Sequence, residues 1–153
     1  MSKIKTIHIS RNGKLQSCIL EKSILSYNEE AELNCIKLKI TVDGVEYVSS
    51  KEFTGLEYAV IDIQKQLPDF MKIACCQTCK YGNFCPFGDV ENEIFCFMAH
   101  TPKDKMDVVD IFSTACDGLP KHDLLFWCRN YQMITDGYYT YNDWDFHFKN
   151  KDS

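Results

Sequence analysis

Long apolar runs and glycosylation motifs are both absent from this 153-residue sequence. A membrane-spanning helix needs about 20 consecutive apolar residues, and no segment approaches that length. The opening residues, MSKIKTIHISRNGKL, carry lysines but lack the apolar stretch of a secretory signal. No N-x-S/T sequon is present. We therefore expect a cytoplasmic protein with no membrane association.

Familiar catalytic motifs are missing as well. The sequence has no glycine-rich phosphate loop, no G-x-S-x-G and no H-E-x-x-H. His122 and Asp123 are neighbours, but adjacent strand residues point to opposite faces, so they do not make a dyad. A pair of Cys116 and His100 has no support beyond the chance pairings that nine cysteines and four histidines allow. These absences favour a non-enzymatic protein.

Positive charge is also in short supply, most of all in the C-terminal part. Residues 1–88 hold 11 basic and 10 acidic residues, whereas residues 89–153 hold 6 and 12. Binding to nucleic-acid phosphates needs clustered cations, so we expect no nucleic-acid ligand. An acidic half suits a basic protein partner, although an acidic surface also serves simply to keep a protein soluble.

Two hairpins are predicted in the N-terminal third. Asp43-Gly44 signals a two-residue turn that pairs Val42 with Val45 and Ile40 with Tyr47. One face of this hairpin is then apolar and buried, made by Ile36, Leu38, Ile40 and Val42. Asn12-Gly13 signals an earlier hairpin, but a two-residue turn there sets Ile9 opposite Gln16. A bulge or a longer loop remains open for that first turn.

An amphipathic helix is predicted after the hairpins, within FTGLEYAVIDIQKQLPDF. Thr54 and Glu57 have the spacing of a capping box, and Pro68 supplies the stop. The apolar stripe that would pack on the sheet consists of Leu56, Val60, Ile63 and Leu67.

The remaining segments complete one α+β domain spanning residues 1–153. The runs FMKIACC, EIFCF and HDLLFWCRNYQMI predict strands, while DKMDVVDIFSTACDG fits a helix or a strand. No repeat, low-complexity tract or long linker divides the chain. We expect an antiparallel sheet of hairpins with one main amphipathic helix and a zinc-ribbon-like cysteine knuckle at residues 72–98.

The cysteine knuckle concentrates five of the nine cysteines. In a reducing compartment clustered cysteines are more often metal ligands than disulfides, and nine cannot all pair. The C-x-x-C of Cys76 and Cys79 lets two thiolates reach one ion, and Cys96 follows from the outgoing strand. Either Cys85 or Cys128 completes the set. Four thiolates saturate zinc, so the predicted site is structural.

Three alternatives to zinc remain open for the knuckle. An iron–sulfur cluster also takes four thiolates, and Cys85-Pro86 is similar to the Cys-Pro that ends ferredoxin motifs. A redox pair of Cys76 and Cys79 would want a helix N-terminus, whereas a turn follows here. A thiol-rich core without metal is the third alternative, and Cys18, Cys35 and Cys116 fit it. Cys75 alternates with Cys76 along the incoming strand, so we expect it to face the other way.

The knuckle resembles a motif of small uncharacterised bacterial cytosolic proteins, some of them similar to immunity proteins encoded beside polymorphic toxins. The matching residues are Cys76, Cys79, Tyr81, Pro86, Gly88, Cys96, Phe97 and, on a late aromatic strand, Cys128. Gly82 and Cys85 depart from the pattern. The resemblance implies that Cys128 is the fourth ligand and Cys85 is additional. It implies no catalytic activity.

A C-terminal aromatic and acidic segment, residues 136–148, is the candidate partner-binding surface. Tyrosine and tryptophan inside an acidic rim are typical of interface hot spots. The candidate residues are Tyr138, Tyr139, Tyr141, Asp143, Trp144 and Asp145. The alternative is that the segment packs on the core.

Together these patterns predict a non-enzymatic protein-binding module with a structural zinc site made of four cysteines. Its partner would be a basic toxin domain that it neutralises as an immunity protein. A thiol redox or iron–sulfur protein using Cys76 and Cys79 is the alternative, as is a phage-defence or counter-defence factor.

Overall fold

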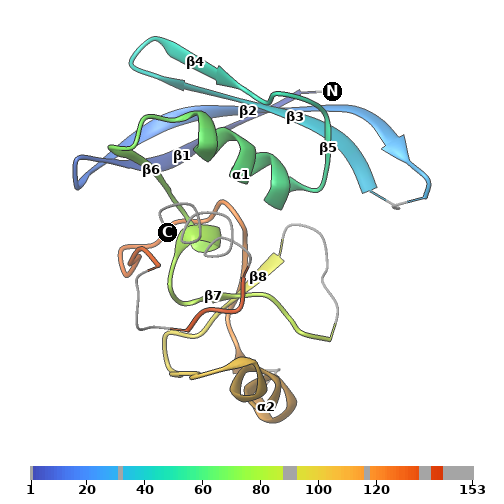
Figure 1. The fold of residues 1–153 in the computed structure, drawn as a ribbon, viewed down its shortest axis with the longest axis vertical. Coiled ribbons are helices and arrows are strands. Elements are labelled where there is room, and N and C mark those ends of the chain that lie inside the picture. Colours follow the sequence, from blue (N-terminus) through green and yellow to red (C-terminus); the bar gives the residue numbers. More distant parts are fainter. Residues whose placement is uncertain (1, 31–32, 88–92, 116–117, 135–138, 143–153) are drawn as a thin grey trace. The chain divides into compact units, whose positions relative to one another are not determined.

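The computed structural model describes residues 2–30, 33–87, 93–115, 118–134 and 139–142. Its mixed composition of two 11-residue helices and mostly antiparallel strands confirms the α+β class (Figure 1). The contacts group the chain into two compact units, Met1–Ile73 and Ala74–Ser153. The single domain expected from the sequence does not anticipate this subdivision, because no linker marks it. No helix among the described residues is long and apolar enough to cross a membrane.

The first unit is built on a curled sheet (Figure 1). Its strands are β1 (Ser2–Arg11), β2 (Lys14–Asn28), β3 (Leu33–Val42), β4 (Val45–Val48), β5 (Phe53–Thr54) and β6 (Met71–Ala74). The order is β4-β3-β2-β1-β6. Strand β5 also pairs with β3, at Cys35 and Ile36, whereas β4 pairs with residues 39–42 of the same strand. The successive pairs from β1 to β4 are antiparallel, as hairpin connections require.

Both predicted hairpins are confirmed, and both have two-residue turns. Asn12 and Asp43 adopt positive φ of 53° and 49°, and each is followed by a glycine at 81° or 82°. This left-handed pair is the turn that Asn-Gly and Asp-Gly favour, because it matches the twist of the strands. The first hairpin has no bulge: Ile9 stands opposite Gln16 and is fully buried. Ile9 is therefore buried on the apolar face of the sheet without any shift in the pairing of β1 with β2.

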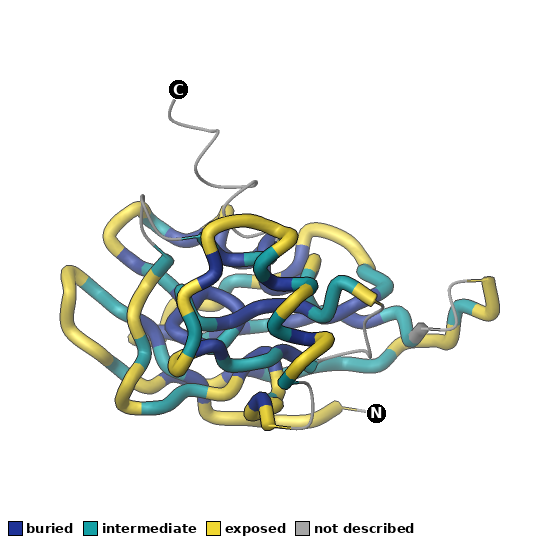
Figure 2. Tube along the Cα trace, turned by 90° about the horizontal axis from the view of Figure 1, so that it is seen from below, coloured by how far each residue is buried: buried dark blue, intermediate teal, exposed yellow. Residues whose placement is uncertain are grey.

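Helix α1 (Leu56–Gln66) lies on one face of this sheet and contacts β3, β4 and β5 (Figure 1). The predicted apolar stripe is confirmed, since Leu56, Val60, Ile63 and Leu67 are all buried. The sheet side chains beneath include Ile7, Ile9, Leu20, Ile36, Leu38 and Ile40. Figure 2 shows how burial is concentrated in the strand centres and exposure at the turns.

The predicted capping box is wrong. The helix begins after Gly55, whose φ of 121° favours glycine, and no side chain caps it. Thr54 is held in β5 by its pairing with Cys35, so its side chain does not reach the first turn. The C-terminal stop is as expected, because Leu67 is already extended before Pro68.

The side chain of Gln64 takes the place of a further strand beside β6. Its Nε2 donates to the carbonyl of Met71 at 2.9 Å, and its Oε1 accepts the N–H of Ile73 at 2.8 Å. All three groups are buried. A buried strand edge would otherwise leave two backbone groups unsatisfied, so the amide closes the edge that β6 presents to α1.

We predict that Gln64→Leu lowers the free energy of unfolding by about 2 to 4 kcal/mol, because two buried backbone groups lose their partners. Gln66→Leu is the matched control, since its amide donates to the carbonyl of Val48 at an exposed site. That control should cost under about 1 kcal/mol. Urea denaturation of the three proteins compares them, and equal losses would contradict the role given to Gln64.

In its described residues, the second unit contains short elements only. They are a 3₁₀ turn η1 (Cys76–Thr78), β7 (Gly82–Asn83), β8 (Glu93–Cys96), α2 (Lys105–Ala115) and β9 (Lys121–Asp123). The three strands form an antiparallel sheet in the order β7-β8-β9. The segment whose structure the sequence left open is thus a helix. It buries Val108 and Phe112 against a cluster completed by Phe97 and Leu119, the α2 cluster.

The long strand expected from HDLLFWCRNYQMI is wrong beyond its first residues, because β9 ends at Asp123. The carboxylate of Asp123 accepts the N–H of Leu125 at 3.0 Å, and its carbonyl accepts the N–H of Phe126 at 3.0 Å. An aspartate that bonds the backbone two residues ahead makes a turn. The apolar residues that follow therefore run through turns and irregular chain, where they contact the cysteine knuckle.

Candidate metal centre

The C-x-x-C motif forms a tight turn. Cys76 to Thr78 make one 3₁₀ turn, and the N–H of Cys79 donates to the carbonyl of Cys76 at 3.3 Å. The chain then reverses, because the N–H of Gly82 donates to the carbonyl of Cys79 at 2.9 Å. Strand β6 thus enters the turn as the sequence indicated, whereas β7, which leaves it, falls in a segment that the sequence predicted as a loop before the strand EIFCF.

Backbone hydrogen bonds from a later segment hold this turn on two sides. On one side Cys76 N–H donates to the Phe126 carbonyl at 2.8 Å. On the other, Lys80 N–H donates to the Gln132 carbonyl at 2.8 Å, and Cys79 forms a bridge with Met133. Cys128 lies between the two attachment points in sequence. Its position beside the turn is therefore set by the path of residues 124–134.

Four of the five predicted ligands line one cavity of about 30 Å³. Cys76 and Cys79 come from the turn, Cys96 from β8 and Cys128 from the later segment. Strand pairing fixes the third of these, since Cys96 stands opposite Gly82. The rest of the lining consists of Tyr81, Gly82, Ile94, Phe95, Met98, His122 and Asn130.

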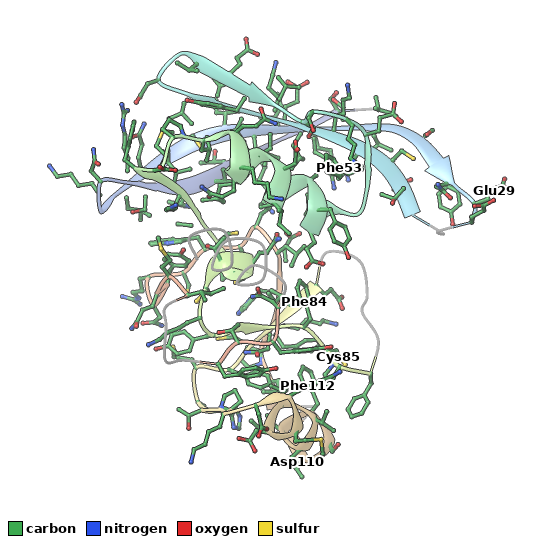
Figure 3. The ribbon with its side chains drawn as sticks, viewed as in Figure 1. Glu29, Phe53, Phe84, Cys85, Asp110 and Phe112 are labelled. Atoms are coloured by element: carbon green, nitrogen blue, oxygen red, sulfur yellow. The ribbon has the colours of Figure 1, made fainter. Side chains whose placement is uncertain are left out.

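Cys85 is placed elsewhere. Its partly buried side chain packs against the α2 cluster, which contains Phe112 (Figure 3). Of the two residues that the sequence left open for the fourth position, the structure brings Cys128 to the cavity and not Cys85. Cys75 is fully buried and is not among the lining residues, in keeping with its alternation with Cys76.

The thiols surround the cavity without forming a finished ligand cage. All eight cysteines in the described ranges are free of disulfides. Within those same ranges, no group of three or more His, Cys, Asp or Glu side chains is already arranged to hold a metal ion. The structure therefore shows thiols gathered at one place, with their sulfurs not converged on one point.

Burial dominates the electrostatics of these thiols. It raises the pKa of Cys76 and of Cys79, and the neighbouring Cys96 and Cys128 raise both further because adjacent thiolates repel. Backbone hydrogen bonds from Gln132 and Tyr81 act in the opposite direction on the pKa of Cys79. Burial also raises the pKa of Cys75, to about 12. Cys75 differs from Cys76 and Cys79 in its position, because it does not line the cavity. Without a cation, the raised pKa values keep Cys75, Cys76 and Cys79 as neutral thiols near pH 7.

His122 is a cavity residue that sequence reasoning set aside. It stands opposite Ile94 across β8 and β9, and its ring stacks on Phe126 with centroids 4.4 Å apart. Its separation from Asp123 follows the alternation of the strand, as expected. Only the register of β8 with β9 could have revealed this position, and three residues of β9 give too little pattern for that.

The described part of the C-terminal aromatic segment contacts the knuckle. Thr140 Oγ1 donates to the carbonyl of Lys80 at 2.7 Å. Asn142 Nδ2 donates to the carbonyls of Gln77 and Gly82, at 3.1 and 2.9 Å. Tyr139 and Tyr141 pack against the α2 cluster, which is the core-packing alternative for these two residues. The other predicted partner-binding residues lie outside the described ranges: Tyr138, Asp143, Trp144 and Asp145.

Gly82 is a position where only glycine fits. A Cβ there would overlap the carbonyl oxygen of Cys76 and lie 2.9 Å from Cδ1 of Ile94. Gly82 is one of the two residues that depart from the bacterial motif. The missing side chain lets β7 pass close to the backbone of Cys76. The close approach brings Cys76 and Cys96 to the same cavity.

Comparison with protein-family models, with curated proteins and with solved structures finds no match to this chain. The interpretation of the site therefore depends on its geometry and on the chemistry of thiols.

We predict that Gly82→Ala destabilises the protein by about 3 kcal/mol or more, because overlap with backbone forces the Cys76 turn away from β7. Gly118→Ala is the matched control, since its Cβ would meet nothing within 4 Å and its φ is not positive. Thermal denaturation followed by circular dichroism provides the comparison. A Gly82→Ala melting temperature equal to that of Gly118→Ala would refute the close approach.

Proposed function

We propose that Cys76, Cys79, Cys96 and Cys128 bind one structural zinc ion, and that the chain is a non-enzymatic protein-binding module. The observation that carries the metal site is the convergence of these four cysteines, from three separate segments, on one cavity of about 30 Å³. With β6 entering and β8 returning, the arrangement is similar to a zinc ribbon.

The donor set suits zinc. Four thiolates complete a tetrahedral ion and leave no position for a substrate, so the ion is structural. The cavity is also far smaller than the 300 Å³ or so of a site for a small organic ligand. A divalent cation would relieve the repulsion among the four thiolates. Binding of the ion would bring the four sulfurs together, and rotation about χ1 is one movement that displaces a sulfur without displacing the backbone.

The same geometry argues against a redox role for Cys76 and Cys79. Reactive cysteines have a lowered pKa, commonly from a helix N-terminus or a nearby cation. Here burial raises the pKa of both, and a 3₁₀ turn followed by a reversal stands in place of a helix. An iron–sulfur cluster would use the same four thiols, and elemental analysis tells the two metals apart.

The expected result is one zinc per chain in freshly purified wild type and in Cys85→Ser, but none in Cys128→Ser. Native mass spectrometry with elemental analysis measures this. Because metal binding is coupled to folding, Cys128→Ser should also melt about 10 °C or more below Cys85→Ser. Metal-free wild type, or loss of zinc from Cys85→Ser alone, would overturn the assignment of the four ligands.

The protein-binding role is supported by charge and by the bacterial resemblance. Residues 74–153 contain 7 basic and 12 acidic side chains, whereas residues 1–73 contain 10 of each. The whole net charge of −5 thus belongs to the second unit. An acidic surface accelerates association with a basic partner. The partner we propose is a basic toxin domain, which the chain would neutralise as an immunity protein.

Affinity purification from the native cells, followed by reconstitution with the purified partner, tests this role. We expect a basic protein that binds one to one, with an association rate falling about tenfold or more between low and high salt. No reconstituted complex, or a complex indifferent to salt, would count against the proposal. Zinc content is measured independently, so either part can fail without the other.

A further inference from the structure

Strand β2 extends well beyond its partner β1. The pairing of β1 with β2 ends at Ser2 opposite Ser23, while the pairing of β2 with β3 continues to Asn28 opposite Leu33. Leu25 to Tyr27 therefore have β3 on one side and no strand of the described residues on the other. We call residues 24–30 and 33–36 of this hairpin the β2–β3 arm (Figure 1).

The arm carries apolar side chains on its surface. The register of β2 and β3 shifts between Ile24 and Ser26, which makes Leu25 the extra residue of a β-bulge. Leu25 is 48% exposed and Tyr27 57% exposed. Large apolar side chains exposed beside an open strand edge mark a surface suited to strand addition.

The tip of the arm is acidic. Glu29 and Glu30 are exposed. Figure 3 shows Glu29 at the far end of the hairpin. A strand lying along the open edge of β2 would run past these carboxylates. Its lysine or arginine side chains would then meet opposite charge, whereas a second copy of the arm would bring more carboxylates.

We propose that the open edge of β2 binds an extended basic segment of a partner protein as an additional strand. Backbone hydrogen bonds along Leu25 to Tyr27 supply the attachment, and Leu25 and Tyr27 receive the apolar side chains of the segment. Glu29 and Glu30 pair with its cations. The inference rests on the proposed protein-binding role and adds to the acidic second unit a strand-binding site on the arm of the first unit, where the attraction is local to Glu29 and Glu30.

An eight-residue peptide of alternating lysine and valine is the probe. Titrated into the ¹⁵N-labelled full chain, it should shift the amide resonances of residues 24–30, with an affinity that falls roughly tenfold from 50 to 500 mM salt. The same peptide N-methylated at every amide has no N–H to donate along either edge, so it cannot pair as a strand and should not bind. A glutamate–valine peptide should not bind either, because it repels the tip.

Variants separate the arm from general surface effects. Tyr27→Lys and the double change Glu29→Lys, Glu30→Lys should each weaken binding about tenfold or more. Ile4→Lys and Glu52→Lys are the matched controls, since Ile4 is 73% exposed on β1 and Glu52 is exposed after β4. Both controls should bind as wild type does.

Four results would overturn the inference. The first three are equal binding of the N-methylated peptide, resonance shifts confined to residues outside the arm, and no binding of the lysine–valine peptide at all. The fourth is a shift of the arm resonances with protein concentration alone, which would assign the edge to a second copy of the chain. Zinc content of the same samples is a separate readout, so failure of the arm does not imply failure of the metal site.

Discussion

The second unit depends on backbone hydrogen bonds made outside any regular ladder. The strands among its described residues are two to four residues long, so few polar groups of those residues are satisfied by sheet pairing. The turn at Cys76–Cys79 is bonded instead by the carbonyls of Leu124, Phe126 and Gln132, and by the side chain of Asn142. Buried backbone groups cost free energy when unsatisfied, so these loop-to-loop bonds determine where the cysteines stand.

The two units solve the problem of stability differently. The first has long strands, type I′ turns and one helix whose stripe covers the apolar face of the sheet. The second has about 80 residues, of which the described ones hold only short strands and one helix, and it is in the size range where a small core often needs a cross-link or a metal. The thiol cavity is found in the unit that lacks a long sheet, and a closed ion there would join segments that hydrogen bonds alone connect.

Local sequence signals predicted the first unit well and the second only partly. Asn12-Gly13 and Asp43-Gly44 fix turns through residues that adopt positive φ readily, and the stripe from Leu56 to Leu67 fixes a helix. The short apolar run EIFCF correctly predicted the strand that carries Cys96. The approach of Cys128 depends on the course of residues 124–134, which has no period, because Asp123 bonds its own backbone and ends β9.

The fixed positions of Thr140 and Asn142 have a consequence for the time course of synthesis. Asn142 bonds carbonyls that precede it by 60 and 65 residues, whereas the sheet of the first unit is closed within residues 1–74. At about 5 to 20 residues per second, the ribosome delivers the last of these contacts several seconds after the first two cysteines. During that interval the turn that carries Cys76 and Cys79 lacks the hydrogen bonds that Asn142 later makes to Gln77 and Gly82.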